Sequence, residues 1–328
     1  MLNVFTGSAF DSLSLTAAMN KLPYKPGRLG AMGLFRRIGI TKTVALIEEQ
    51  HGKLSLIPDK PRGVQTTLNT RASREARPFK ANHLPVNDQI LADDVQGIRA
   101  FGSEDATETI ADVVNEMLAT MRQSLEVTVE YHRIGAIRGI VLDADGSTVL
   151  RNLFTEFSIT ENTVNFDFTA GAQDMKTKST EVIRVVEEAL GATPYDHIHA
   201  ICGNDFWDSF IAHESVVRAF ERHQENSFAR TQQRSGFAFS DIIWENYRGK
   251  VGTVDFIPAD TCRFFPVGVP DLFLEHYAPA NFIETVNTVG KPVYAKQEPL
   301  PMGTGIAMHS QSNPLLICTR PGALVKGS

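Results

Sequence analysis

The chain has 328 residues, a formal net charge of −6 and a hydrophobic fraction of 42%. These values are ordinary for a folded protein of two or more domains, and they give no global signature of a nucleic-acid-binding protein. No apolar run approaches the roughly 18 residues of a membrane helix, so the sequence predicts a soluble, unsecreted protein with no membrane partner.

Residues 1–41 are expected to form an N-terminal arm rather than a domain, because glycine and proline interrupt every apolar pattern except a possible short helix at Leu13–Met19. From Ser12 to Lys42 the arm carries six basic residues and no acidic one. The arm is therefore expected to be either a solvated basic tail or a segment held by the rest of the chain or by a neighbouring molecule.

Two β-rich runs follow, at Lys42–Ile57 and Phe79–Leu91, and the segment between them is polar. This pattern predicts a long hairpin or extended loop over residues 42–92. Its tip is basic, with a net charge of +4 from Pro58 to Lys80.

A long helix is predicted over residues 103–136, because apolar residues recur there at spacings of three and four. Ser103 suits its N-cap, and at 1.5 Å per residue the helix would be roughly 50 Å long. The alternation of Val127, Val129 and Tyr131 also fits a strand. The other face is acidic, with a net charge of −6 from Glu104 to Glu130.

Opposite charges on the loop and the helix suggest that the loop of one copy lies across the helix of its neighbour, although each charge run could also simply face water. The predicted contact joins Arg62, Arg71, Arg74, Arg77 and Lys80 with Glu104, Asp105, Glu108, Asp112 and Glu116.

The rest of the chain predicts a mixed α/β block over residues 173–290. The expected helices lie at 174–190, 205–212 and 215–223, and the expected strands at 140–142, 148–150, 154–168, 197–202, 239–245, 251–257, 272–276 and 315–319. The last strand is expected to return to the domain of the long helix, which would then comprise residues 93–172 and 291–328.

No common catalytic or phosphate-binding motif occurs, so the sequence predicts no catalytic site, no cofactor and no metal. The best metal candidate, His197 and His199 with Asp205, would suit a metal-dependent hydrolase, but two histidines on one strand are more often half-buried structural residues. Cys202, Cys262 and Cys318 each lie among apolar residues and read as buried hydrophobic side chains rather than a disulfide framework.

Three short stretches, together with the order of elements, carry a resemblance to a known family. They are the strand, turn and aromatic helix from His197 to Phe210, the pair of strands from Tyr247 to Ile257, and Gln311-Ser312-Asn313-Pro314-Leu315-Leu316. The chain resembles the lambda-type major capsid protein E family of tailed double-stranded DNA phages.

The resemblance implies an α+β protein with the Hong Kong 97 phage capsid fold. Residues 1–41 would be the N-arm, 42–92 the extended loop, 93–172 and 291–328 the peripheral domain with spine helix 103–136, and 173–290 the axial domain. A lysine–asparagine crosslink of some relatives finds no matching residues here.

It also implies that copies assemble as hexamers and pentamers of an icosahedral virion shell in the host bacterial cytoplasm. The expected partners are other copies, portal, scaffold and decoration proteins, and double-stranded DNA bound non-specifically, with Arg28, Arg36 and Arg37 of the arm facing that DNA. A nanocompartment shell of the same fold, enclosing an enzyme, is the main alternative.

Overall fold

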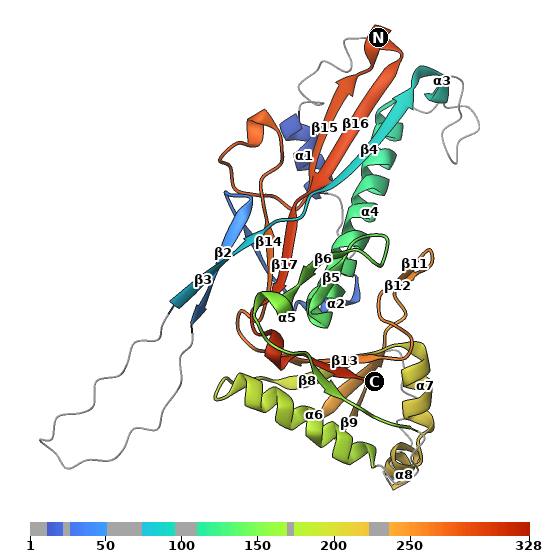
Figure 1. Ribbon diagram of the computed structural model, residues 1–328. Coiled ribbons are helices and arrows are strands. Elements are labelled where there is room, and N and C mark those ends of the chain that lie inside the picture. Colours follow the sequence, from blue (N-terminus) through green and yellow to red (C-terminus); the bar gives the residue numbers. More distant parts are fainter. Residues whose placement is uncertain (1–11, 22–26, 51–73, 96–109, 169–173, 223–235) are drawn as a thin grey trace, which may run out of the picture.

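The computed structural model describes residues 12–21, 27–50, 74–95, 110–168, 174–222 and 236–328, which form an elongated molecule with helices and small sheets (Figure 1). The helices are α1 Ser12–Lys21, α2 Arg28–Met32, α3 Ala92–Val95, α4 Ile110–Arg138, α5 Leu153–Glu156, α6 Met175–Leu190, α7 Asn204–Ala212 and α8 Glu214–Arg222, with short 3-10 turns η4 Ile283–Thr285, η5 Pro301–Gly303 and η6 Pro321–Ala323. The strands are β1 Arg36–Gly39, β2 Val44–Gln50, β3 Arg74–Lys80, β4 Leu84–Leu91, β5 Ile140–Leu142, β6 Val149–Asn152, β7 Asn162–Val164, β8 His197–Cys202, β9 Phe237–Phe239, β10 Ile242–Asn246, β11 Lys250–Val251, β12 Val254–Asp255, β13 Cys262–Val267, β14 Phe273–Tyr277, β15 Tyr294–Pro299, β16 Gly305–Ser312, β17 Pro314–Cys318 and β18 Val325–Gly327.

Helix α4 is the predicted long helix, and it runs along the upper half of the molecule (Figure 1). It continues as a helix through Val127–Tyr131, so the strand alternative for that segment is wrong. Its apolar stripe is buried, as the spacing of Val114, Leu118 and Leu125 predicts. The helix ends before Gly139, whose positive φ of 76° suits a residue that reverses the chain. Residues 103–109 of the predicted helix lie outside the described residues.

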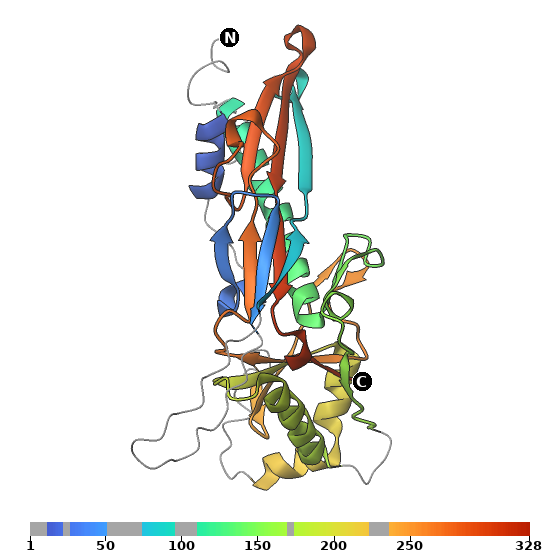
Figure 2. The ribbon, with the colours of Figure 1, turned by 60° about the vertical axis from the view of Figure 1, so that its left-hand side comes forward.

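Strands β15, β16 and β4 form an antiparallel sheet that lies beside the first half of α4 (Figure 2). Helix α1 packs on β15, where the Thr16 hydroxyl donates to the carbonyl of Ala295 and accepts from its N–H, both at 3.1 Å. Strand β4 covers residues 84–91, the end of the predicted extended loop, and it pairs with β16 over eight residues.

The extended loop itself begins as the antiparallel hairpin β2–β3, which projects from the body (Figure 1). Its predicted basic tip falls mainly on residues 51–73, which lie outside the described residues. The sheet β1–β14–β17 joins the arm to the body, because β1 of the arm pairs in parallel with β14. The strand predicted at 272–276 corresponds to β14, and its side chains pack in the same hydrophobic core as those of α4.

The lower part of the molecule is a six-stranded sheet in the order β7-β18-β13-β8-β10-β9, with α6, α7 and α8 close to it (Figure 1). Its core is aromatic: the rings of Phe210 and Trp244 stack at 3.9 Å, and Phe264 meets Trp244 edge-on at 5.2 Å. Strands β7 and β18 come from outside residues 173–290, so this sheet is wider than the predicted axial domain. The division of the chain into domains stays a prediction.

The prediction of one or two strands over residues 154–168 is wrong in part. The segment contains the helical turn α5 as well as the three-residue strand β7. Phe154 and Phe157 are three residues apart, so one turn of helix buries both side chains.

None of the helices in the described residues has the length and apolar character of a membrane span.

Candidate functional site

The predicted contact between a basic loop and an acidic helix is only partly covered by the structure. Arg62, Arg71, Glu104, Asp105 and Glu108 lie outside the described residues. Of the remaining residues, Arg74 begins β3, Lys80 ends it, and Asp112 and Glu116 belong to the first two turns of α4. The contact stays a prediction.

Arg77 already contacts its own chain. Its guanidinium lies over the ring of Phe157, 5.3 Å from the centroid, and donates to the carbonyl of Glu156. The side chain is half-buried. Arg77 therefore helps to fix the hairpin against the body, a role that the sequence did not suggest.

Two acidic residues of the predicted acidic face also differ from the prediction. Glu126 forms an ion pair with Arg122 at 2.6 Å, one turn away on α4. Glu130 is only 4% exposed, so it does not belong to a solvent-facing surface. The exposed acidic charge of α4 is thus smaller than the sequence count suggests.

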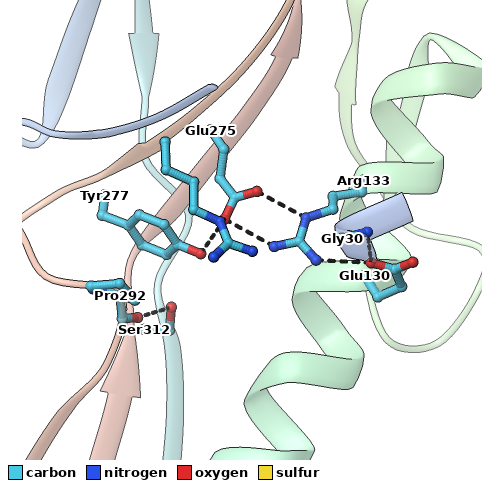
Figure 3. A network of polar contacts seen from close by, with 8 residues as sticks. Gly30, Glu130, Arg133, Glu275, Tyr277, Pro292 and Ser312 are labelled. Atoms are coloured by element: carbon cyan, nitrogen blue, oxygen red, sulfur yellow. Dashed lines mark hydrogen bonds and ion pairs between the residues drawn. The ribbon is translucent and has the colours of Figure 1, made fainter. Parts of the chain in front are cut away.

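Glu130 belongs to a buried group of charged side chains, which we call the junction network. It joins three segments that are far apart in the sequence: Arg37 of β1, Glu130 and Arg133 of α4, and Glu275 and Tyr277 of β14. Figure 3 shows Arg133 between the two carboxylates, with Tyr277 on the far side of Glu275. The network thus lies where the arm, α4 and the sheet β1–β14–β17 meet.

The distances in the junction network are those of charge-assisted hydrogen bonds. Arg133 donates from Nε and Nη2 to the two carboxylate oxygens of Glu275, at 2.8 and 2.9 Å, and from Nη1 to Glu130 at 2.8 Å. Nε of Arg37 lies 3.1 Å from Oε1 of Glu275. Two guanidinium groups thus meet two carboxylates, so the charges compensate each other.

Tyr277 adds a further donor to Glu275. Burial, followed by the negative charge of Glu275, raises the pKa of Tyr277 well above its ordinary value. The hydroxyl therefore stays protonated and donates a hydrogen bond to Glu275. Glu275 is fully buried and accepts from three side chains. A buried carboxylate of this kind depends on all of these donors.

Glu130 also holds the arm directly. Its carboxylate accepts from the backbone N–H groups of Leu29, at 2.6 Å, and Gly30, at 3.2 Å, which lie in the first turn of α2. These groups have no partner within a short helix, so the carboxylate satisfies them. Gly27 leaves room for it, because a Cβ there would lie 2.3 Å from the carboxyl carbon of Glu130.

A second charged contact joins the arm to the six-stranded sheet. Arg28 donates to both carboxylate oxygens of the buried Glu245, at 2.6 and 2.8 Å, and Nε2 of His199 lies 3.1 Å from the same carboxylate. Burial alone would raise the pKa of Glu245, but the hydrogen bonds from His199 and Arg28 outweigh it, so the pKa is lowered. Arg36 has a weaker partner, the exposed Asp271, at 2.6 Å.

Two cavities, of about 320 and 260 Å³, lie at the junction network, and Arg37 and Arg133 line both. The network contains two carboxylates, but bound arginines neutralise both, and the group holds no nucleophile beside a base. Its chemistry is suited to holding segments together. The sequence did not predict it, because its members are separated by up to 240 residues.

The candidate metal ligands do not form a cluster. His199 bonds to Glu245, and Asp205 is exposed in the first turn of α7. Among the described residues, no group of three or more histidine, cysteine, aspartate or glutamate side chains could hold a metal ion. All three cysteines are buried, as predicted.

The chain is similar in sequence to known proteins. The family model described as "Phage major capsid protein E" matches residues 11–328. A curated relative, the major capsid protein of Pseudomonas phage KPP10, is 27% identical over 339 residues, which cover 97% of this chain and 96% of the relative. The major capsid protein of Salmonella phage Felix O1 is 26% identical over 360 residues, which cover 99% and 98%.

Solved structures support the predicted fold. A candidate capsid protein of a prophage in E.coli CFT073 has a TM-score of 0.58 at 15% identity, covering 97% of this chain and 98% of that one. The procapsid of satellite phage P4 contains a chain with a TM-score of 0.52 at 7% identity, covering 100% and 98%. At these identities the likeness concerns the fold, and it confirms the Hong Kong 97-like α+β architecture.

Proposed function

Since the chain belongs to the phage major capsid protein E family, we propose that its copies form hexamers and pentamers that close into an icosahedral shell around double-stranded DNA. The protein is a structural component of a phage capsid, and its location is the virion. We also propose that the shell assembles in the bacterial cytoplasm and contacts portal, scaffold and decoration proteins.

The projecting hairpin β2–β3 is the observation that carries the proposal of self-assembly. Its inner face packs on the body through Ala45, Ile47 and Phe79, all buried. Its outer face presents Leu46, which is 67% exposed, beside Val44 and opposite Pro78. A hairpin that extends from the body with an apolar outer face leaves area that a neighbouring subunit can bury.

Replacing Leu46 with aspartate is therefore expected to prevent shell assembly while the subunit stays folded. Loss of one buried leucine weakens a contact by about 2 kcal/mol, roughly 30-fold in affinity, and the added carboxylate would also have to leave water. Each shell repeats the contact many times. Electron microscopy and sedimentation of the purified protein measure particle yield, and circular dichroism checks the fold.

The matched control is Leu46→Met, which keeps the size and apolar character of the side chain. We expect particles from this variant in wild-type yield. If Leu46→Asp also gave normal particles, the outer face of the hairpin would not be part of the contact between subunits.

We keep the proposal that the basic loop lies across the neighbouring α4, but without Arg77. Arg77 is excluded because it contacts Phe157 and Glu156 of its own subunit. Glu116 supports the proposal, since it is exposed on α4. An exposed ion pair contributes only about 0–1 kcal/mol, so these charges would set the register of the contact more than its strength.

Replacing Arg71 and Arg74 with glutamate is expected to weaken association of subunits by about 5- to 30-fold at low salt, since attraction at two sites becomes repulsion. Adding Asp112→Lys and Glu116→Lys to the same chain should restore assembly, because both signs are then exchanged. Light scattering during assembly, at several salt concentrations, follows both variants. Absence of rescue by the second pair would contradict the pairing.

The proposal that the arm faces packaged DNA receives little support from its arginines. Arg28 and Arg37 are matched by the buried carboxylates Glu245 and Glu275, so their charges already serve the fold. Arg36 is the most exposed of the three, with a side chain 63% exposed. Any contact of this arm with DNA would therefore depend on Arg36 more than on its two neighbours.

The alternatives from the sequence are less well supported. A nanocompartment shell would have the same fold, but the family match and both curated relatives concern phage capsid proteins. DNA rather than an enzyme is the expected content of purified particles. A hydrolase built on His197, His199 and Asp205 lacks a clustered ligand set in the described part of the chain.

A further inference from the structure

Two buried cysteines face each other in the middle of the six-stranded sheet. Cys202 is the last residue of β8 and Cys262 the first of β13, and the antiparallel register places them directly opposite. Both residues have no solvent exposure, and their sulfur atoms are 3.0 Å apart. Cys318 is equally buried but lies in β17, in another sheet.

The backbone geometry at this pair suits a bond between the strands. The next pair along, Gly203 and Thr261, is hydrogen-bonded, with a distance of 2.8 Å from the Gly203 nitrogen to the Thr261 oxygen. Pairs alternate in an antiparallel ladder, so Cys202 and Cys262 form a non-hydrogen-bonded pair. Pro266, which has no N–H to donate, lies at another non-hydrogen-bonded position of the same two strands. The Cα atoms of such pairs are about 4.5 Å apart, at the short end of the range that disulfides span.

We propose that Cys202 and Cys262 form an intrachain disulfide when the folded protein meets a small peroxide. One thiol attacks hydrogen peroxide, which gives a sulfenic acid and water, and the opposing thiol then displaces the sulfenic oxygen as a second water. Two thiol hydrogens and two electrons leave the protein, and one peroxide is reduced to two waters. The sulfur atoms need to approach by about 1 Å to reach bonding distance.

The same surroundings keep the pair reduced at first. Burial and the neighbouring Cys202 thiol raise the pKa of Cys262 well above its ordinary value, so the reactive thiolate is scarce. A reducing cytoplasm also maintains thiols, whereas conditions outside a cell oxidise them. The disulfide is thus expected after the particle leaves the cell. This timing rests on the proposed assembly, whereas the bond itself concerns the fold of the subunit and is tested on the unassembled chain as well.

The bond would enclose the segment between residues 202 and 262, which holds α7, α8, β9 and β10. It would also join β8 to β13, the two central strands of the sheet. Closing such a loop reduces the freedom of the unfolded chain. Oxidation is therefore expected to make this sheet harder to unfold.

The test uses wild-type particles and the unassembled full-length chain, each exposed to hydrogen peroxide or buffer, then denatured with an alkylating reagent and digested. Mass spectrometry should recover a peptide pair joined through Cys202 and Cys262 after peroxide, with two hydrogens fewer than the separate peptides. Cys318 should be recovered as a single peptide. Cys318→Ala is the matched control and should form the same joined pair, whereas Cys262→Ala should not.

The proposal is wrong if intact particles are treated with peroxide and both Cys202 and Cys262 are still alkylated after denaturation. It is also wrong if peroxide converts them to sulfinic acids without joining them, or if either pairs instead with Cys318. Because the main measurement uses the wild-type chain, these results do not depend on whether any cysteine variant folds.

Discussion

Replacing Glu275 with glutamine is expected to lower the free energy of unfolding of the subunit by about 3–5 kcal/mol. Glu275 is fully buried and bonds to the guanidinium of Arg133, which is only 2% exposed. Glutamine is nearly the same size, so the change leaves the shape of the core intact but removes the charge. Arg133 then keeps its ion pair with Glu130 but loses the charge of Glu275, and Arg37 loses its ion pair with Glu275 at 3.1 Å.

Urea unfolding of the unassembled chain, followed by circular dichroism, measures this loss, and the matched control is Asp271→Asn. Asp271 pairs with Arg36, the neighbour of Arg37 on β1, but both side chains of that pair are exposed. The same change of charge should cost only about 0–1 kcal/mol there. Asparagine also tolerates the positive φ of 53° at this position. Equal losses in the two variants would mean that burial does not set the strength of the junction network.

The junction network matters for a shell protein because it fixes where the arm lies. Glu130 holds the first turn of α2, Arg37 binds Glu275, and β1 pairs with β14 beside them. The arm therefore reaches the base of the hairpin β2–β3 from a fixed position on α4. An error in this junction would move the hairpin, and with it the contact that we propose between subunits.

Elements with strong local periodicity were predictable from the sequence. Helix α6 follows Asp174, whose carboxylate accepts from the N–H of Lys176 at 3.0 Å, and it ends at Gly191 with a positive φ. Strand β8 was predicted at its observed bounds, because it is short, apolar and followed by a glycine. In each case the signal lies within a few neighbouring residues.

Features that depend on distant partners were not predictable. Strand β18 has only three residues and exists through its pairs with β13 and β7. Glu130 was counted on an exposed acidic face, because the sequence does not show that Arg133, Leu29 and Gly30 surround it. One hint was present: Arg133 sits inside an apolar stretch of α4, where an isolated cation needs a buried carboxylate.

Acid is expected to destabilise the subunit through His132, which lies in α4 next to the Tyr131 ring and has no solvent exposure. Among the described residues neither ring nitrogen has a hydrogen-bond partner. Burial lowers the pKa of His132 to about 4, although Asp143 in the turn after β5 acts in the opposite direction. The folded protein therefore favours the neutral ring.

The sign follows from comparing the two states. Above pH 6.5 the ring is neutral in both the folded and the unfolded chain, so its titration does not affect stability. As the pH falls from 6.5 to about 4, the unfolded chain binds a proton that the folded chain resists. The loss approaches about 3 kcal/mol, since each pKa unit corresponds to about 1.4 kcal/mol.

Replacing His132 with phenylalanine removes this titration and keeps an aromatic ring in the core. Urea unfolding of the wild type and of His132→Phe between pH 7 and pH 4 measures the difference, and other acid-sensitive groups cancel because both chains carry them. We expect the wild type to lose about 3 kcal/mol more than the variant over this range. Parallel curves would mean that His132 is protonated at similar pH in the folded and unfolded chain, and that its burial in α4 does not govern the response to acid.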